Sequence, residues 1–435
     1  MSTVFGRTLR RLRTQSVRSI GYLGVSQFVT VLIPLLTTPW VLRALQPGGY
    51  GNYVLVTSIV GYGAVLIDFG FSVSATQRVA HIRDDKAALT RYFWTVQSAR
   101  FFLAIIAIAM AIIVVVALPQ FRHLLQIMLA YSPYLLGALL YPSWLFLGLE
   151  RIRLLAVSDV IARTAAVAPI FGLVHSPADT TSLALIWAGS SVFSGLLACG
   201  LIVRHHFVGG FVRPTAAEMM TAYREAWPLF ITRVSATMYS ISNTVLLGLV
   251  QTVYQVGIFN AADKVRIYSL LPLDPFMSVF FPRISREMAR DRAAAVATTR
   301  KLALVLLAGM GSISVLLFLG ARPIIRLITG DGFDSAIAVL KILAVLPFIE
   351  AVTTILGSIA MVSIGMNREL ARIHVIAGVF NVALLIVLGS RLGAVGAAMS
   401  LTATYSLIAV AEAIALRKTA LLGDIFLRRR TPAGG

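Results

Sequence analysis

Twelve long apolar segments separated by short polar gaps run through the 435-residue chain. A helix needs about 20 mostly apolar residues to cross the ~30 Å hydrocarbon core of a bilayer, and the segments have about that length. The predicted spans are residues 19–45, 53–74, 92–118, 124–147, 154–174, 182–203, 226–250, 254–281, 302–324, 337–357, 373–388 and 392–415. The pattern predicts an all-α membrane protein with 12 transmembrane helices in two pseudo-symmetric groups of six.

Most basic residues lie in the two tails or in every second gap between these spans. Of the 38 Lys and Arg residues, 27 lie in alternate gaps and the two tails, 5 lie in the other gaps or within three residues of them, and 6 lie deeper within spans. Because cytoplasmic loops are rich in Lys and Arg, we expect both termini in the cytoplasm. The predicted organisation is a basic N-terminal segment (1–18), an N-lobe (19–204), a cytoplasmic linker (205–224), a C-lobe (225–416) and a basic tail (417–435).

Composition narrows the functional class. A chain that is 58% hydrophobic and 13% charged, with mean hydropathy +0.85, is not a soluble domain. The net charge of +20 does not indicate nucleic-acid binding, because the basic residues lie beside membrane ends, where they meet anionic lipid. Cys199 is the only cysteine, which excludes an intramolecular disulfide. No phosphate-binding glycine loop, zinc-type spacing or Ser/His/Asp arrangement is present, so we predict no metal and no enzymatic activity.

The two groups of six spans have the same orientation, which predicts a parallel repeat. An offset of 206 residues places Gln27 opposite Arg233 and Thr38 opposite Thr244. The same offset places Asp68 at the position of Asp274, so an intramembrane carboxylate recurs at equivalent depth.

The six cations within spans are the main functional signal. An Arg or Lys at the bilayer centre costs about 2.5–3.5 kcal/mol on insertion scales, so such residues should face the protein interior or a watery cavity. Lys341 is expected to snorkel to the outer interface. The other five are predicted to form a cationic lumen for an anionic substrate: Arg100, Arg163, Arg233, Lys264 and Arg266. Polar residues predicted to line the same cavity are Gln27, Gln97, Thr237, Ser240 and Thr244.

Carboxylates in or near the spans suggest ion coupling. A buried carboxylate can carry a proton or bind Na⁺ while a transporter changes conformation. The candidates are Asp68, Asp159, Asp263, Asp274 and Glu350, and H⁺ or Na⁺ is the only cofactor that the sequence suggests. The alternative is structural, in which Asp159–Arg163 and Asp263–Arg266 are ion pairs that lower the cost of insertion.

Several short motifs, in a fixed order along most of the chain, carry a family resemblance. They are residues 66–71, 74–78, 83–86, 142–146, 148–151, 256–259, 261–264 and 281–285. In these segments the chain resembles the polysaccharide transporter (Wzx-type) oligosaccharide flippases of the MATE-like superfamily. Asp68, Asp263 and Lys264 lie inside the matched motifs.

The resemblance implies a V-shaped pair of six-helix lobes that alternates between inward-open and outward-open states. It implies transport of undecaprenyl-pyrophosphate-linked oligosaccharide repeat units from the cytoplasmic to the outer leaflet of a bacterial inner membrane. O-antigen, exopolysaccharide and capsule synthesis all use this step. The resemblance leaves open which glycan is carried and whether a polysaccharide polymerase or a chain-length protein is a partner.

Three alternatives remain. A MATE-like cation-coupled drug or metabolite antiporter exports mostly cations, which the six intramembrane cations disfavour. A flippase for the lipid-linked peptidoglycan precursor typically has two extra spans. A membrane glycosyltransferase or polymerase needs a large outer loop with catalytic carboxylates, and the longest outer gap, 321–335, offers only Asp331 and Asp334.

Overall fold

The computed structural model describes the backbone of residues 2–240, 242–417 and 419. Side chains are described from residue 32 onward, apart from 235, 236, 238–240, 274, 275, 278, 279, 282, 289, 292 and 293 in those ranges. In this described part, eight helical stretches are long and apolar enough to cross a membrane. They are Leu32–Ile82, Lys86–Ala117, Pro119–Gly148, Ile152–Leu173, Pro177–Arg204, Ala294–Leu319, Ser335–Met361 and Asn367–Arg417.

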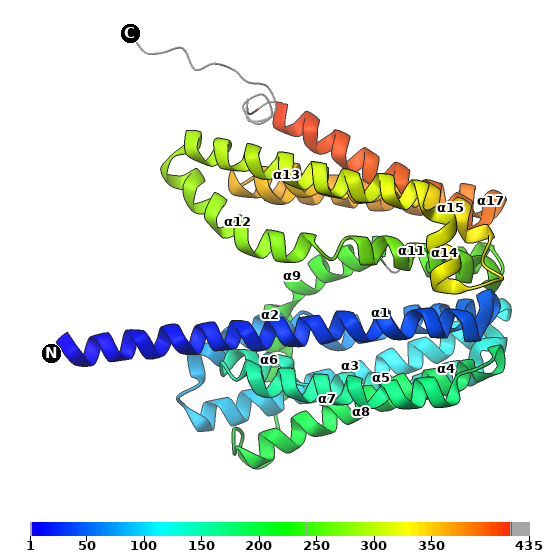
Figure 1. Cartoon of the computed structure of the whole chain (residues 1–435). Coiled ribbons are helices and arrows are strands. Elements are labelled where there is room, and N and C mark those ends of the chain that lie inside the picture. Colours follow the sequence, from blue (N-terminus) through cyan, green and yellow to red (C-terminus); the bar gives the residue numbers. More distant parts are fainter. Residues whose placement is uncertain (1, 241, 418, 420–435) are drawn as a thin grey trace, which may run out of the picture. The chain divides into compact units, whose positions relative to one another are not determined.

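The chain divides into two compact units, Met1–Thr237 and Met238–Gly435. In unit 1, α1 packs against α3 and α7, and α8 packs against α5 and α7 (Figure 1). The helices of unit 1 are α1 (Ser2–Asp68), α2 (Phe71–Ile82), α3 (Lys86–Ala117), η1 (Pro119–Leu124), α4 (Leu125–Tyr131), α5 (Pro133–Leu140), α6 (Ser143–Gly148), α7 (Ile152–Leu173), η2 (Pro177–Asp179), α8 (Thr180–Arg204) and most of α9 (Ala216–Ser240).

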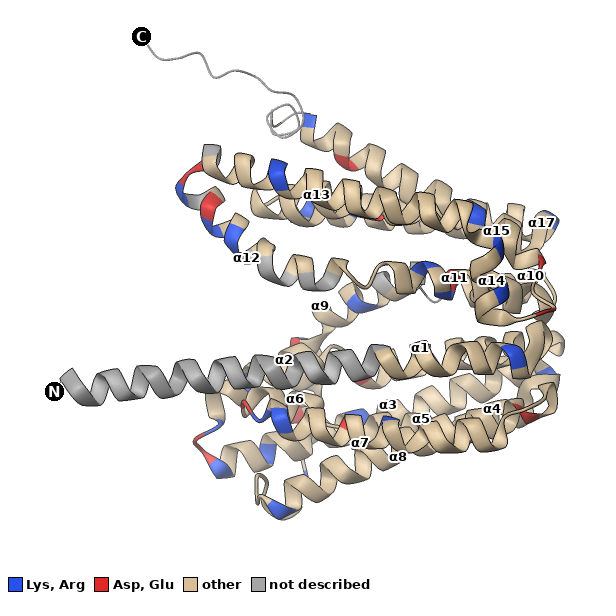
Figure 2. Cartoon of the chain, in the orientation of Figure 1, with Lys and Arg blue, Asp and Glu red and all other residues tan. Residues whose placement is uncertain are grey.

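In unit 2, the long helix α17 packs against α10, α15 and α16, while α13 packs against α12 and α16. The helices are α10 (Ser242–Val250), α11 (Val253–Ser269), α12 (Leu273–Arg290), α13 (Arg292–Leu319), α14 (Ala321–Thr329), α15 (Ser335–Leu343), α16 (Leu346–Thr353), the π-helix η3 (Thr354–Met361) and α17 (Asn367–Arg417). Figure 2 shows long uncharged stretches along α8 and most of α13, as expected for helices that cross hydrocarbon.

Two very long helices each contain one interruption. Gln46 (φ 56°) interrupts α1 between the predicted spans 19–45 and 53–74, and Gly393 (φ 59°) interrupts α17 between the predicted spans 373–388 and 392–415. In unit 2, α10 ends at Val250 and α11 begins at Val253, with Thr252 extended between them. Gln46 and Thr252 are 206 residues apart, so the offset of the predicted repeat also relates these two breaks.

The predicted span 53–74 contains a break that the sequence analysis did not predict. Phe69 and Gly70 both have positive φ, so α1 ends at Asp68 and α2 starts at Phe71. A Cβ on Gly70 would lie 2.9 Å from atoms of the α9 backbone, so only glycine allows this approach. Phe69 stacks on Phe230 with ring centroids 4.3 Å apart. The turn therefore packs against the middle of α9 within unit 1.

Other predicted spans are also divided. The span 124–147 is built from α4, α5 and α6, with Pro133 at the start of α5 and Pro142 at the start of α6. Proline lacks the amide donor that a continuing helix needs, which explains these breaks. Spans 254–281 and 302–324 are likewise divided, the first between α11 and α12 and the second between α13 and α14.

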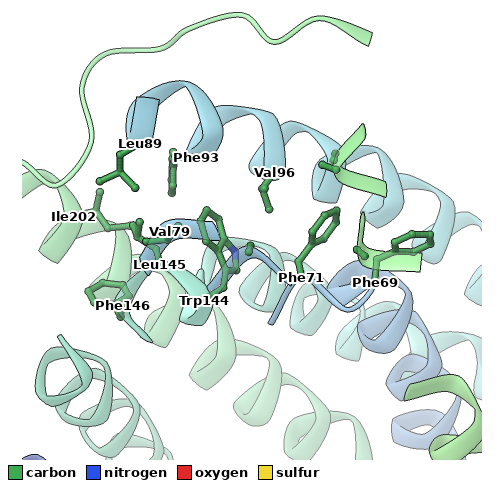
Figure 3. Close-up of a cluster of buried hydrophobic side chains, with 14 of the residues drawn as sticks. Phe69, Phe71, Val79, Leu89, Phe93, Val96, Trp144, Leu145, Phe146 and Ile202 are labelled. Atoms are coloured by element: carbon green, nitrogen blue, oxygen red, sulfur yellow. The ribbon is translucent and has the colours of Figure 1, made fainter. Parts of the chain in front are cut away.

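The core of unit 1 near α2, α3 and α6 is aromatic. Trp144 is 1% exposed and lies among Phe93, Val96 and Phe71 (Figure 3). The ring centroids of Trp144 and Phe93 are 5.7 Å apart. This cluster holds α6 against α2 and α3, which places the α5–α6 break beside the polar residues of α3.

Candidate functional site

Arg100 is a residue of α3, and its side chain caps the C-terminal end of α5. Its Nη2 donates to the carbonyl oxygen of Ala138 at 2.6 Å, and its Nη1 donates to that of Leu139 at 3.2 Å. The last carbonyls of any helix have no partner within the helix, and inside a membrane no bulk water can satisfy them. Since Pro142 stops the helix from continuing, a buried guanidinium is an effective cap. Arg100 is only 4% exposed.

Two neighbours complete this cap. Gln97 lies one turn before Arg100, accepts from its Nη1 at 3.4 Å, and donates to the Leu139 carbonyl at 2.7 Å. The thiol of Cys199 donates to the Leu140 carbonyl at 3.3 Å. Asp68, at the end of α1, lies within electrostatic range of Arg100 and accepts from Ser72 Oγ at 3.0 Å. The role of Arg100 and Gln97 in binding a substrate stays a prediction.

Asp159 and Arg163 form the ion pair that their spacing allowed. The Nε of Arg163 lies 2.8 Å from Oδ2 of Asp159 on consecutive turns of α7. The side chain of Arg163 is 34% exposed and that of Asp159 is 21% exposed, so both charges remain accessible.

Unit 2 contains a buried ionic cluster. Arg266 Nε lies 2.6 Å from Asp263 Oδ1 within α11, so the two residues form the ion pair that their spacing allows. Arg266 Nη1 also pairs with Glu350 of α16, which is 84 residues away in sequence. Lys264 is half-buried on the same helix. Two carboxylates therefore surround Arg266, and Lys264 is the remaining cation of this group.

Arg233 differs from the other four predicted lumen cations. It is exposed on α9, and in the part of the chain that the structure describes its guanidinium makes no hydrogen bond or ion pair. Its carbonyl accepts from the hydroxyl of Thr237, one turn later, at 2.9 Å. Thr244 belongs to α10 and donates to Asn260 at 3.0 Å. An exposed cation without a counter-charge is available to an anionic ligand.

Some predicted residues lie outside the described side chains: Gln27, Ser240 and Asp274. Lys341, expected at the outer interface, is exposed, and its Nζ lies 5.9 Å from the centre of the Phe318 ring.

Glu412 was missed by the sequence analysis. It is 1% exposed in α17, and its Oε1 lies 3.7 Å from Nε2 of His374. Its Oε2 has no hydrogen-bond partner among the described residues. Gly357 of the π-helix η3 lies so close that a Cβ there would collide with Oε1. The sequence did contain a signal for Glu412, because it lies inside the predicted span 392–415. An acidic residue inside an apolar span is a functional candidate by default.

The chain is similar to known proteins over most of its length. The model of the family described as "Polysaccharide biosynthesis protein" matches residues 16–288. A protein of Escherichia coli (strain K12) described as "Putative O-antigen transporter" is 28% identical over 93% of this chain and 97% of its own length. A protein of Shigella dysenteriae with the same description is 24% identical over 87% of this chain and 94% of its own.

Solved structures share the fold. A structure of the lipid II flippase MurJ in an inward closed conformation superposes with a TM-score of 0.70, at 13% identity, over 93% of this chain and 90% of its own. An inward-facing multidrug resistance MATE family transporter of the MOP superfamily gives 0.69, at 14% identity, over 93% and 98%. At such low identities the likeness concerns the fold alone.

Proposed function

Because the chain belongs to the polysaccharide biosynthesis protein family, we propose that it is a flippase for polyprenyl-pyrophosphate-linked oligosaccharide repeat units. It is a multi-pass protein of the bacterial inner membrane. The relatives described as O-antigen transporters support a surface-polysaccharide precursor as the substrate. The substrate crosses from the cytoplasmic to the outer leaflet, and no bond is made or broken in that step.

The single structural observation that supports this function is the exposed Arg233 without a counter-charge. A pyrophosphate needs cations to leave the aqueous phase, and a cation 4 Å away contributes about 4 kcal/mol at an effective dielectric of 20. Arg163 and Lys264 are the next candidates, since both are only partly buried. The two Nη atoms of Arg100 and the Nε and Nη1 atoms of Arg266 already contact protein acceptors, so we assign both arginines a structural role beside the pathway.

We further infer twelve spans with both termini in the cytoplasm. Two of the eight apolar stretches are 51 residues long, or about 75 Å at 1.5 Å per residue, which is more than twice the hydrocarbon thickness. The breaks at Gln46 and Gly393 allow each of these helices to cross the membrane and return. The excess of Lys and Arg in alternate gaps supports the orientation.

Alternating access of the two units would require an energy source. We propose that a proton or Na⁺ supplies it through carboxylates of unit 2, with Glu412, Asp263 and Glu350 the most buried of those described. A polysaccharide polymerase that consumes the translocated unit is the expected functional partner.

The test is transport in proteoliposomes that contain a polyprenyl-pyrophosphate-linked oligosaccharide in one leaflet. The purified chain should expose the glycan to periodate added on the opposite side, at a rate well above that of protein-free vesicles. A lipophilic cationic dye serves as the second substrate, because an antiporter of the same fold would move the dye instead. Movement of the dye without movement of the glycan would contradict the proposal.

A further inference from the structure

One end of unit 1 contains a pocket that the proposed function does not use. It has a volume of about 360 Å³ and lies where three connections meet, those between α2 and α3, α6 and α7, and α8 and α9. This end is the one that the charge pattern places in the cytoplasm. The volume is within the range of small-ligand sites.

The polar lining of the pocket is mostly basic. Arg83, Lys86 and Arg151 contribute three permanent cations, His206 adds an imidazole, and Asp84 is the one acidic residue. Arg83 is already paired with Glu150, with 2.9 Å between Nη1 and Oε1. In the described part of the chain, Lys86 and Arg151 make no ion pair, so the two charges remain available to a ligand.

The pocket is built from constrained backbone. Glu150 and His206 both have positive φ, at 57° and 50°, although neither is glycine. Such conformations cost on the order of 1–3 kcal/mol and concentrate at functional sites. The turn at Glu150 places Arg151 on the rim, and the turn at His206 brings the α8–α9 connection to the same place. Leu89, 3% exposed, contributes an apolar side chain to the lining.

We propose that this pocket binds a phosphate group at the cytoplasmic face of the protein. Lys86 and Arg151 are free cations, and Arg83 is shared with Glu150; together they suit a phosphate group. A phosphate accepts hydrogen bonds from a guanidinium and is attracted by the compact charge of a Lys ammonium. The ligand is the head group of an anionic lipid or a soluble phosphate compound. This site is separate from the pathway residue Arg233 and does not depend on the identity of the transported glycan.

The experiment uses the full-length chain in detergent and two probes, inorganic pyrophosphate and phosphatidylglycerol, with phosphatidylcholine as the neutral lipid. Binding is measured by titration calorimetry for pyrophosphate and by native mass spectrometry for lipid. The test variant is Lys86→Gln/Arg151→Gln, in which both side chains are exposed, so folding should be retained. The matched control is Arg213→Gln, an exposed cation of the α8–α9 connection that does not line the pocket.

We expect the double variant to weaken binding at least tenfold and the control to bind like the unaltered chain. Loss of pyrophosphate binding supports a soluble ligand, and loss of selective phosphatidylglycerol binding supports a lipid ligand. The proposal is overturned if neither probe binds, if the double variant binds as well as the unaltered chain, or if Arg213→Gln weakens binding equally. A single Arg151→Glu variant should also abolish binding, and intact binding there would be equally damaging.

Discussion

The Nη2 atom of Arg100 lies 2.6 Å from the carbonyl oxygen of Ala138, so a cation buried in α3 caps the last turn of α5. A guanidinium presents several donors in one plane, and here it serves two successive carbonyls that Pro142 leaves without helical partners. The same contact explains how a charge is tolerated inside an apolar helix. Its donors replace water for a helix end that would otherwise be unsatisfied.

Arg100→Leu should therefore destabilise unit 1. The substitution removes two charge-assisted hydrogen bonds and leaves the Ala138 carbonyl buried without this donor, at a cost of about 2 kcal/mol, while Gln97 still donates to the Leu139 carbonyl. The measurement is the midpoint of thermal unfolding in detergent. Cys199→Ala is the matched control, since it removes only a weak thiol donor from the same helix end and should change the midpoint much less. Equal midpoints for Arg100→Leu and the unaltered chain would show that the cap is not needed.

Residue spacing predicted some of these contacts and not others. Asp159 and Arg163 are four residues apart on one helix, a spacing that allows an ion pair, and they form one. The Arg100 cap joins α3 to α5, and the partners lie 38 and 39 residues away in sequence. Helical periodicity gives the facing of residues on one helix, but not which neighbouring helix will meet them. The helical class follows from apolar length, whereas cross-helix partners require the fold.

The helix breaks were likewise only partly predictable from the sequence. The break near Gln46 was predicted, because a short polar gap with Pro47 separates two apolar runs. The break at Phe69 and Gly70 falls within a single apolar run and depends on the close approach of α9 to Gly70. Glu412 could have been found from sequence alone as a charge in an apolar span. Its proximity to Gly357 could not, because that contact joins two separate helices.

Removing Arg266 alone should cost more than removing its whole ionic cluster. Arg266→Met leaves Asp263 and Glu350 buried without a counter-charge, which typically costs about 3 kcal/mol. The triple variant Asp263→Asn/Arg266→Met/Glu350→Gln removes the uncompensated charges and should recover most of that loss. The measurement is thermal unfolding in detergent.

Arg163→Met is the control for this comparison. The side chain of Arg163 is 34% exposed, against 9% for Arg266, so the cost should be about 1 kcal/mol or less. A triple variant less stable than Arg266→Met would mean that the cluster's charges stabilise the fold as a unit.

Gly357→Ala should destabilise unit 2 through a collision with Glu412. A methyl group there would overlap Oε1 of that carboxylate, and overpacking of this kind costs about 1–3 kcal/mol. In a Glu412→Ala background only the 3.1 Å approach to Leu370 Cδ1 remains, so the same substitution should cost less. Gly378→Ala is the matched control in the same unit, because nothing lies within 4 Å of its Cβ, and alanine should stabilise that helix by about 0.5–1 kcal/mol. Equal costs of Gly357→Ala in both backgrounds would exclude this contact as the cause.

Acid should loosen the connection between α8 and α9. Hydrogen bonds from Thr215, together with Arg91, hold the pKa of Glu218 below its usual value. The folded pKa is lower than the unfolded one, so the stabilisation is complete above the unfolded value, near 4.3, and is lost as pH falls through the folded pKa. Hydrogen exchange of residues 205–215 should therefore accelerate over that range.

Glu218→Gln should remove this pH dependence, because no carboxylate remains to titrate. Glu225→Gln, on the same helix, should retain it. Trp94 and Thr90 also hold the connection, through hydrogen bonds to Gly210 and Gly209 at 3.0 and 2.9 Å, so the segment should loosen without full release. An identical acceleration in Glu218→Gln would assign the effect to another group.

Arg233→Ala should slow glycan transport without weakening the fold. The side chain is exposed and makes no ion pair among the described residues, so its removal leaves no buried group unsatisfied. If the guanidinium meets the pyrophosphate, the transport rate should fall at least tenfold, which is about 1.4 kcal/mol. Arg224→Ala changes another exposed arginine of α9 and serves as the control. Cells that depend on this chain should then accumulate lipid-linked repeat units on the inner leaflet with Arg233→Ala and not with Arg224→Ala. Normal surface glycan in the Arg233→Ala strain, at equal protein levels, would remove this residue from the pathway.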